Sequence, residues 1–221
     1  MTTHRFQPTR YYSTIGSHEP ALHVADGDTV ITATADAGGW DGNNARVASG
    51  GNPQSGPFYV EGAEPGDTLA VDIVRLTPNR DTGWTASVLA ENVVDPAHVR
   101  ELPSGGAVIW QIDREKRTVA LMDPPANAFD GTRTVLAPPD ALRNLVLPFA
   151  PMVGCFGVAP AGGEAISTAT SANHGGNMDY RGFTEGVTVY FPVAVPGALF
   201  HIGDGHALQG DGEIVGTGIE T

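Results

Sequence analysis

Short apolar runs, separated by turns that contain glycine or proline, recur along the whole chain and are typical of β-strands. We expect strands over residues 22–24, 29–34, 57–63, 68–76, 84–89, 107–112, 118–122, 187–191, 197–202 and 213–219. Asp26–Asp28 lies between two of these runs and predicts a hairpin. Glu64–Asp67 predicts a second tight reversal, because its proline and glycine suit the central positions of a turn. The charged segment Asp113–Arg117 predicts the solvated tip of a hairpin.

Helical periodicity is scarce in this sequence. Residues Asp140–Leu147 predict two helical turns that end at Pro148. The apolar segment Leu145–Pro160 is interrupted by prolines and glycines, and it predicts a buried strand with bends. We therefore expect one all-β domain over residues 1–221, sandwich- or barrel-like with few short helices. A soft sub-boundary is expected near residues 126–139, where Pro, Asp and Gly gather.

Composition and charge restrict the binding partners and the cellular compartment that we expect for this protein. The chain has 12 Lys and Arg against 25 Asp and Glu, a formal net charge of −13, and Lys116 is its only lysine. Surfaces that follow phosphates need clustered basic residues, so we expect neither nucleic acid nor an anionic membrane as a partner. No apolar run reaches the ~18 residues of a membrane span, and the first residues lack a signal-peptide core. Cys155 is the only cysteine and cannot form an intrachain disulfide, so we expect a cytoplasmic protein.

Familiar covalent machineries are poorly supported by the residues present. No G-x-S-x-G, G-x-G-x-x-G or P-loop sequence occurs, which removes the corresponding serine hydrolase and nucleotide-binding signatures. An amidase that needs a buried lysine would have to use Lys116, which lies in a charged turn. Cys155 lies in an apolar run, which favours a packed thiol over a reactive one.

The densest group of polar side chains lies in residues Gly203–Glu213, which carry three carboxylates, one imidazole and one carboxamide among glycines. Asp204 and His206 are two positions apart, so both point to one side of an extended segment. Imidazole and carboxylate are ligands for zinc, whereas extra carboxylates favour calcium. We expect Asp204 and His206 to hold a divalent metal ion, with zinc preferred and calcium as the alternative. An acidic surface loop whose glycines serve only turns is the competing interpretation.

A second polar group lies in residues Asn173–Asp179, around two adjacent glycines. The carboxamide of Asn177 can both donate to and accept from a small polar substrate, and Asp179 adds a carboxylate. We therefore expect Asn177 and Asp179 to bind substrate. Asn-His-Gly-Gly-Asn is also good turn chemistry, and that alternative stays open.

Two isolated carboxylates, Glu61 and Asp36, are further candidates for a functional site. Glu61 interrupts an apolar strand just before a glycine, so it is either a partly buried proton carrier with a raised pKa or a solvent-facing residue. Asp36 ends a β-like run before two glycines, where it either joins a site or lies in a plain hairpin loop.

Four segments of this sequence together resemble the acetamidase/formamidase family, in the order in which the family has them. They are SGPFYVEGAEPGD (55–67), PFAPMVGCFGVAP (148–160), HGGNMD (174–179) and GALFHIGDGHALQGDGEIVGTGIE (197–220), the last being the most specific. The likeness runs from about Asp26 to the last residue. It implies hydrolysis of small amides such as formamide or acetamide to ammonia and a carboxylate, on a β-rich scaffold in homo-oligomers of two or more copies.

Roles for individual residues follow from this resemblance. Asp204, His206 and Glu213 look like the metal or proton-transfer end of the site, and Asp36 resembles a family acid that joins the metal ligands. His174, Asn177 and Gln209 look like polar groups near the substrate, Gln209 as a substrate-binding residue and His174 as a catalytic candidate. Glu213 or Glu61 would move the proton of the attacking water. A β-sandwich that only binds a metal ion or a small polar ligand is the alternative function.

Two features depart from the family. Trp40 follows two glycines where relatives more often have glutamine, so we expect a reshaped or smaller pocket. The sequence ends at Thr221, whereas family members usually run on for many tens of residues, so we regard it as a short form.

Overall fold

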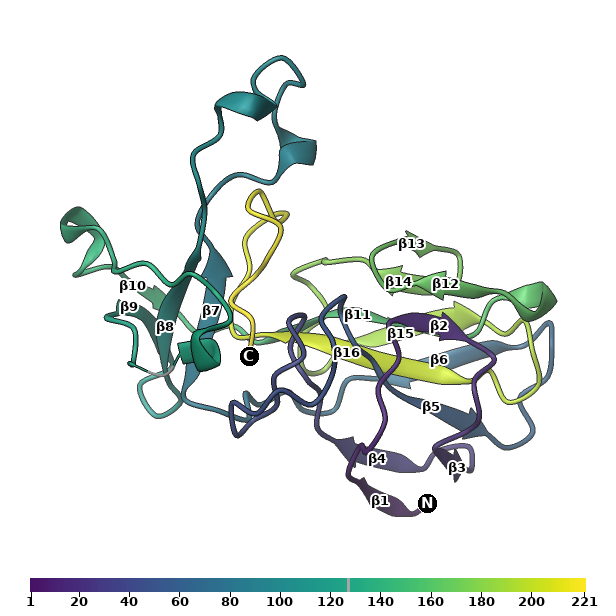
Figure 1. Cartoon of the computed structure of the whole chain (residues 1–221). Helices are drawn as coiled ribbons and strands as arrows, with labels where there is room; N and C mark the ends of the chain where they lie inside the picture. Colours follow the sequence, from purple (N-terminus) through teal and green to yellow (C-terminus); the bar gives the residue numbers. More distant parts are fainter. Residues whose placement is uncertain (127) are drawn as a thin grey trace.

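The computed structural model describes residues 1–126 and 128–221, and Figure 1 shows their arrangement. The strands are β1 (Thr3–Phe6), β2 (Thr14–Gly16), β3 (Leu22–Val24), β4 (Thr29–Thr32), β5 (Ser55–Val60), β6 (Thr68–Asp72), β7 (Thr82–Ala86), β8 (Ala107–Asp113), β9 (Thr118–Met122), β10 (Val146–Pro148), β11 (Met152–Gly157), β12 (Ala165–Ser167), β13 (Ser171–Ala172), β14 (Gly175–Asn177), β15 (Thr188–Pro192) and β16 (Phe200–His206). The helical segments are the 3-10 turns η1 (Glu91–Val93), η2 (Val99–Glu101), η3 (Ala128–Gly131), η4 (Asp140–Leu142) and η5 (Ala161–Gly163). The described residues contain no α-helix, so the all-β prediction is confirmed.

The largest sheet has six strands in the order β13-β14-β11-β16-β5-β3. Its central strand β11 is buried along its whole length, because its residues are apolar or small on both faces. The two-stranded sheet of β15 and β6 covers it through a core that includes Phe58, Phe156, Phe191 and Phe200. Phe156 and Phe191 meet edge to face, with ring centroids 5.5 Å apart. β11 and β16, which this packing covers, are hydrogen-bonded neighbours in the large sheet.

A second sheet of four strands, in the order β10-β9-β8-β7, has a core of its own around Trp110 and Val119. The end of the chain joins the two sheets, since Glu220 forms a β-bridge to Trp84 of β7 on one side and to His206 of β16 on the other. In Figure 1 the C-terminus lies between β7 and β16. The last residues of the chain therefore place a carboxylate at the junction of the sheets.

The hairpin predicted at Asp26–Asp28 is wrong, although its turn forms, and the tight reversal predicted at Glu64–Asp67 is present. Asp28 N–H donates to the Ala25 carbonyl and closes the first turn, but β3 then pairs in parallel with β5, and β4 pairs in parallel with β1. The Asp28 carboxylate accepts from Thr2 N–H and from the His4 ring, which holds β1 beside β4. After Glu64–Asp67 the chain likewise changes sheet, because β6 pairs with β15 and not with β5. The β8–β9 hairpin, whose tip follows Asp113, is confirmed.

The predicted helix over Asp140–Leu147 is also wrong in length. Only the single turn η4 forms, and residues from Val146 onward instead pair with β9 as strand β10. The bent crossing predicted for Leu145–Pro160 is present as β10 and β11, but only β11 is buried, because Val146 and Pro148 of β10 are exposed. Asn127, inside the expected sub-boundary at residues 126–139, lies outside the described residues, and the division of the chain stays a prediction. Among residues 1–126 and 128–221, no helix is long and apolar enough to cross a membrane.

Candidate active site

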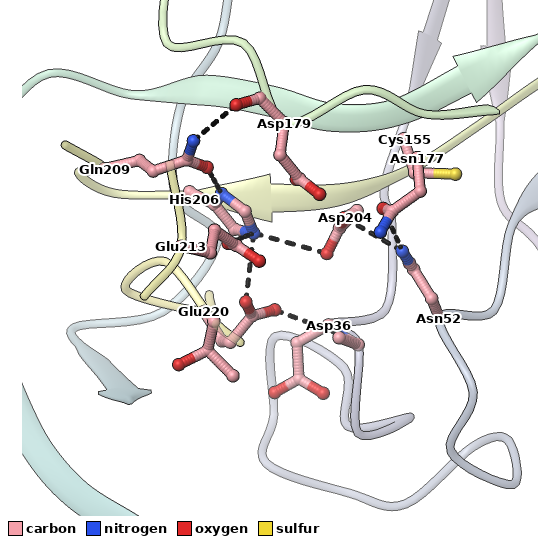
Figure 2. Close-up of polar contacts among 12 residues, drawn as sticks. Asp36, Asn52, Cys155, Asn177, Asp179, Asp204, His206, Gln209, Glu213 and Glu220 are labelled. Atoms are coloured by element: carbon pink, nitrogen blue, oxygen red, sulfur yellow. Dashed lines mark hydrogen bonds and ion pairs between the residues drawn. The ribbon is translucent and has the colours of Figure 1, made fainter. Parts of the chain in front are cut away.

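His206 is the last residue of β16 and is buried at the junction of the two sheets. Its Nε2 faces three carboxylates, as Figure 2 shows: Glu220 Oε1 at 3.0 Å, Asp204 Oδ1 at 3.3 Å and Glu213 Oε1 at 3.7 Å. Asp204 and His206 point the same way from β16, as their spacing of two predicts. Glu213 reaches them from the glycine-containing loop that follows β16. We call Asp179, Asp204, His206, Glu213 and Glu220 the carboxylate–imidazole cluster.

The other ring nitrogen of His206 is held by Gln209, whose Oε1 lies 2.8 Å from Nδ1. Gln209 Nε2 donates to the carbonyl oxygen of Asp179 at 2.6 Å, so its oxygen must be the atom that faces the ring. His206 Nδ1 therefore carries a hydrogen. In the neutral ring Nε2 then carries a lone pair directed at the carboxylates, which is the orientation a metal ligand needs.

Two glycines leave the space that the side chains of the cluster occupy. A Cβ at Gly154 would lie 2.3 Å from Asp179 Oδ1 and 2.7 Å from Asp204 Oδ2, and a Cβ at Gly218 would lie 2.6 Å from His206 Nδ1. Neither position can carry a side chain without displacing the site. Asp204 itself has a φ of 61°, an unusual backbone for a residue of a strand. Such conformations persist where the surrounding structure enforces them, often at functional sites.

The cluster is short of positive charge. Burial raises the pKa of Glu213 to about 8 and the pKa of Asp179 to about 6, and Asp204 adds to both shifts. Burial also raises the pKa of Glu220. For His206, burial alone lowers the pKa, but the charges of Glu220 and Asp204 outweigh it and raise the pKa well above its usual value of 6.5. Four carboxylates share one imidazole, so a bound cation would relieve their repulsion.

The donor set fits a metal ion. One ligand atom each from Asp204, His206 and Glu220 lie within 4.8 Å of one another, and the same holds for Asp179, His206 and Glu213. Asp179 Oδ1 and Glu213 Oε1 are buried and lack a hydrogen-bond partner among the described residues. An imidazole nitrogen with several carboxylate oxygens is a typical ligand set for zinc and similar divalent ions. The described residues thus contain a buried His/Asp/Glu group that can hold a metal ion.

A cavity of about 410 Å³ adjoins the cluster and would admit a small molecule. Its lining includes polar and apolar residues: Asn92, Val93, Asn177, Asp179, Gly212, Glu213, Ile214 and Gly216. Trp40 is not among the described residues that line it, and instead packs edge-on against Phe129, with ring centroids 4.9 Å apart.

Asp36 lies beside the cluster but faces away from it. Its carboxylate accepts from Arg80 Nη2 at 2.5 Å, from Trp84 Nε1 at 2.9 Å and from the backbone N–H groups of Gly38 and Trp40. These four donors occupy both oxygens, and Asp36 and Arg80 are both buried. The geometry therefore gives Asp36 a structural ion pair in place of a contact with His206.

Glu61 and His174, the other two catalytic candidates, also lie outside the cluster. Glu61 was expected to be either a partly buried proton carrier or a solvent-facing residue, and the structure shows the second. Its side chain is 57% exposed and accepts a hydrogen bond from His23 at 2.6 Å. His174 is buried in the turn before β14, and neither of its ring nitrogens has a partner among the described residues. Burial lowers the pKa of His174, which favours the neutral ring.

Sequence reasoning missed Glu220 and Asn52. Glu220 is a lone acid in an apolar, glycine-containing tail, and only its pairing with β7 and β16 brings it to His206. Asn52 follows two glycines in a segment without a chemical motif, yet its side chain contacts Asp204 and Asn177. Asp211, the third carboxylate of residues 203–213, lies outside the cluster and pairs with Arg181 at the surface.

Comparison with known sequences points to one family. The sequence profile of the Acetamidase/Formamidase family matches residues 136–221, which include every member of the cluster. An acetamidase of Mycolicibacterium smegmatis is 31% identical over 197 residues, 72% of this chain and 48% of that protein. A formamidase of Methylophilus methylotrophus is 29% identical over 188 residues, 72% of this chain and 46% of that protein. The chain thus spans about half the length of the curated relatives it matches.

Solved structures agree with the sequence relatives. The crystal structure of an acetamidase from Bacillus halodurans matches this fold with a TM-score of 0.70 and 31% sequence identity. The match covers 98% of this chain and 66% of that one. The similarity therefore includes both sheets and the junction that carries the cluster.

Proposed function

Because this chain belongs to the acetamidase/formamidase family, we propose that it hydrolyses the C–N bond of small linear amides of the formamide and acetamide type. The products are ammonia and a carboxylate. The observation that carries the proposal is the carboxylate–imidazole cluster, which borders a cavity of a size that a small amide can enter.

His206, Asp204 and Glu220 would hold a divalent metal ion, with Asp179 and Glu213 completing its surroundings. We propose zinc, since the imidazole nitrogen is a ligand that zinc favours, and calcium is the alternative because oxygen donors are in the majority. When bound, such an ion supplies Lewis-acid polarisation to the carbonyl group and to water. Gln209 supports this role by fixing the hydrogen of His206 on Nδ1.

Glu213 is the residue that we propose moves the proton. It lines the cavity and is carried on a loop, whereas His206 and Asp204 are fixed in a strand. Glu213 beside a bound divalent ion would keep its carboxylate form, which burial alone disfavours. Water attacks the carbonyl carbon and loses a proton to that carboxylate, so that a new C–O bond forms. The C–N bond then breaks as Glu213 returns the proton to nitrogen, which leaves as ammonia, and the acid product loses its remaining proton to solvent to become the carboxylate. Glu61 and His174 take no part in this step, because both lie outside the cluster.

Substrate would be held by Asn177 and Asp179, which line the cavity. Gln209, also expected at the substrate, already uses both ends of its carboxamide within the protein. We therefore propose that it positions His206 and does not contact the amide. Val93 and Ile214 offer apolar surface for a short acyl group.

The test is a panel of formamide, acetamide, propionamide and urea, in which ammonia release is followed and bound metal is measured on the same sample. We expect release from at least one of the first two amides, none from urea, and close to one divalent ion per chain. A protein that holds metal yet releases no ammonia from any amide contradicts the proposal.

A non-catalytic metal-binding domain is the competing function, and one observation favours it. Asp204, His206 and Glu220 are all buried where two sheets meet, a place where an ion would also strengthen the fold. That function predicts a large rise in melting temperature with metal and binding of acetamide without ammonia release.

The proposal includes a cytoplasmic homo-oligomer. A single buried cysteine suits a reducing compartment, and exposed apolar side chains such as Val146 and Tyr190 offer surface for self-association. Light scattering after size-exclusion chromatography tests the assembly, and a monomer at assay concentration would contradict it.

A further inference from the structure

Asn52 connects two polar side chains of the site through one amide group. Its Nδ2 donates to Asp204 Oδ2 at 2.9 Å and to Asn177 Oδ1 at 3.0 Å, contacts that Figure 2 draws as dashed lines. A side-chain amide nitrogen has two hydrogens, and these are its two shortest contacts, since the carbonyl oxygen of Thr168 lies farther away at 3.5 Å. Asn52 is 9% exposed, which removes water as a ready replacement for the donor.

Gln54 fixes the orientation of the Asn52 amide through hydrogen bonds to its oxygen end. Gln54 is fully buried, and its Nε2 donates to both Oδ1 and the backbone carbonyl of Asn52, each at 3.1 Å. A rotation of the Asn52 amide by half a turn would therefore set two donors face to face and an oxygen against the Asp204 carboxylate. The backbone of Asn52 has a φ of 57°, a left-handed conformation that asparagine tolerates better than most residues.

This arrangement determines which oxygen of Asp204 faces His206 and which end of the Asn177 amide remains for a substrate. Asp204 Oδ2 is occupied, so Oδ1 is the oxygen that faces His206 Nε2 at 3.3 Å. Asn177 Oδ1 is occupied as well, which leaves its Nδ2 as the end of the amide that can donate to a substrate. Within the described part of the chain no hydrogen bond uses that nitrogen, and Asn177 lines the cavity beside Glu213.

We propose that Asn52 is a positioning residue that holds Asp204 as an oxygen ligand beside His206 and aims Asn177 Nδ2 at the carbonyl oxygen of the substrate. The second part rests on the proposed amide hydrolysis. A fixed N–H donor at a carbonyl oxygen stabilises the negative charge that develops there when water attacks. Partners that orient a ligand carboxylate affect metal affinity although they never touch the metal.

The test compares Asn52→Gly with Asn44→Gly. Asn44 is exposed and has the same φ of 57°, so its replacement by glycine has the same backbone effect without contact to the site. For Asn52→Gly we expect zinc affinity, measured by chelator competition with zinc alone, to fall about 10- to 100-fold. We expect kcat to fall at least about tenfold with a smaller change in KM, because the Asn177 donor acts on developing charge. Asn44→Gly should change neither.

A double variant separates positioning from simple destabilisation. If Asn52 acts on catalysis through Asn177, then Asn52→Gly combined with Asn177→Ala has a kcat no lower than the more impaired of the two single variants. If Asn52→Gly does not fold, Asn52→Asp keeps the shape and the backbone while it replaces the donor by an oxygen, and the same losses are expected. Wild-type zinc affinity and kcat in either variant would overturn the positioning role alone. A wild-type chain that neither binds zinc nor cleaves any amide would overturn it together with the proposed function.

Discussion

The Nδ1–H group of His206 donates to the side-chain oxygen of Gln209 across 2.8 Å, while the amide nitrogen of Gln209 is anchored on the Asp179 carbonyl. This relationship ties the orientation of the only imidazole in the cluster to a neighbour three residues away. It keeps Nε2 directed at the carboxylates.

Gln209→Leu removes both hydrogen bonds while keeping similar bulk. The imidazole then loses the partner that fixes its hydrogen on Nδ1, so zinc affinity should fall about 10- to 100-fold in chelator competition. Gln111→Leu is the matched control, because Gln111 is an exposed residue of β8. Equal zinc affinities in the two variants would show that Gln209 does not position the ring.

Asp36→Asn tests whether Asp36 is a metal ligand or a structural residue. The change leaves the buried guanidinium of Arg80 without its carboxylate, so the metal-free protein should lose about 3–5 kcal/mol of unfolding free energy in urea. Zinc should still bind to the folded variant. Loss of zinc binding with unchanged stability of the metal-free protein would instead place Asp36 among the ligands.

Glu61→Gln should leave kcat/KM for acetamide unchanged, because Glu61 and its partner His23 are both more than half exposed and lie outside the cluster. The matched change Glu213→Gln keeps the shape of the side chain but removes the proposed proton carrier, and kcat should drop by about 10²-fold or more. The prediction fails if the Glu61 variant is the more impaired of the two.

Stability should decline with acid through His201. Burial lowers the pKa of His201 to about 4, whereas in the unfolded chain it titrates near 6.5. Between these values the unfolded state binds more protons, so His201 costs up to about 3 kcal/mol of stability as the pH falls from 6.5 to 4. His201→Gln can keep the donor to the Gly16 carbonyl and should unfold in urea with a weaker pH dependence over this range. Parallel pH profiles for wild type and variant would contradict the burial of a neutral ring.

The local parts of the site could be predicted from the sequence. The spacing of Asp204 and His206 on one strand is enough to place both on one face, and glycines allow Glu213 to fold back. Glu220 could not be found this way, because its contact with His206 depends on β-pairing between the end of the chain and two separate sheets. Nor could the burial of Asp36, whose partner Arg80 lies 44 positions away.

The errors in the fold have the same origin. The turn at Asp26–Asp28 is a local property and forms, but which strands then pair depends on distant partners, so β3 and β4 join β5 and β1. Likewise, Val146 and its neighbours have some helical periodicity, yet hydrogen bonding to β9 outweighs that weak local preference.

The most direct measurement is ammonia release by the wild-type chain after chelation and stepwise return of zinc. We predict that the metal-free protein is inactive on formamide and acetamide, and that activity rises in proportion to bound zinc until about one ion per chain is bound at the carboxylate–imidazole cluster. Full activity in a protein verified to be free of metal would contradict the account.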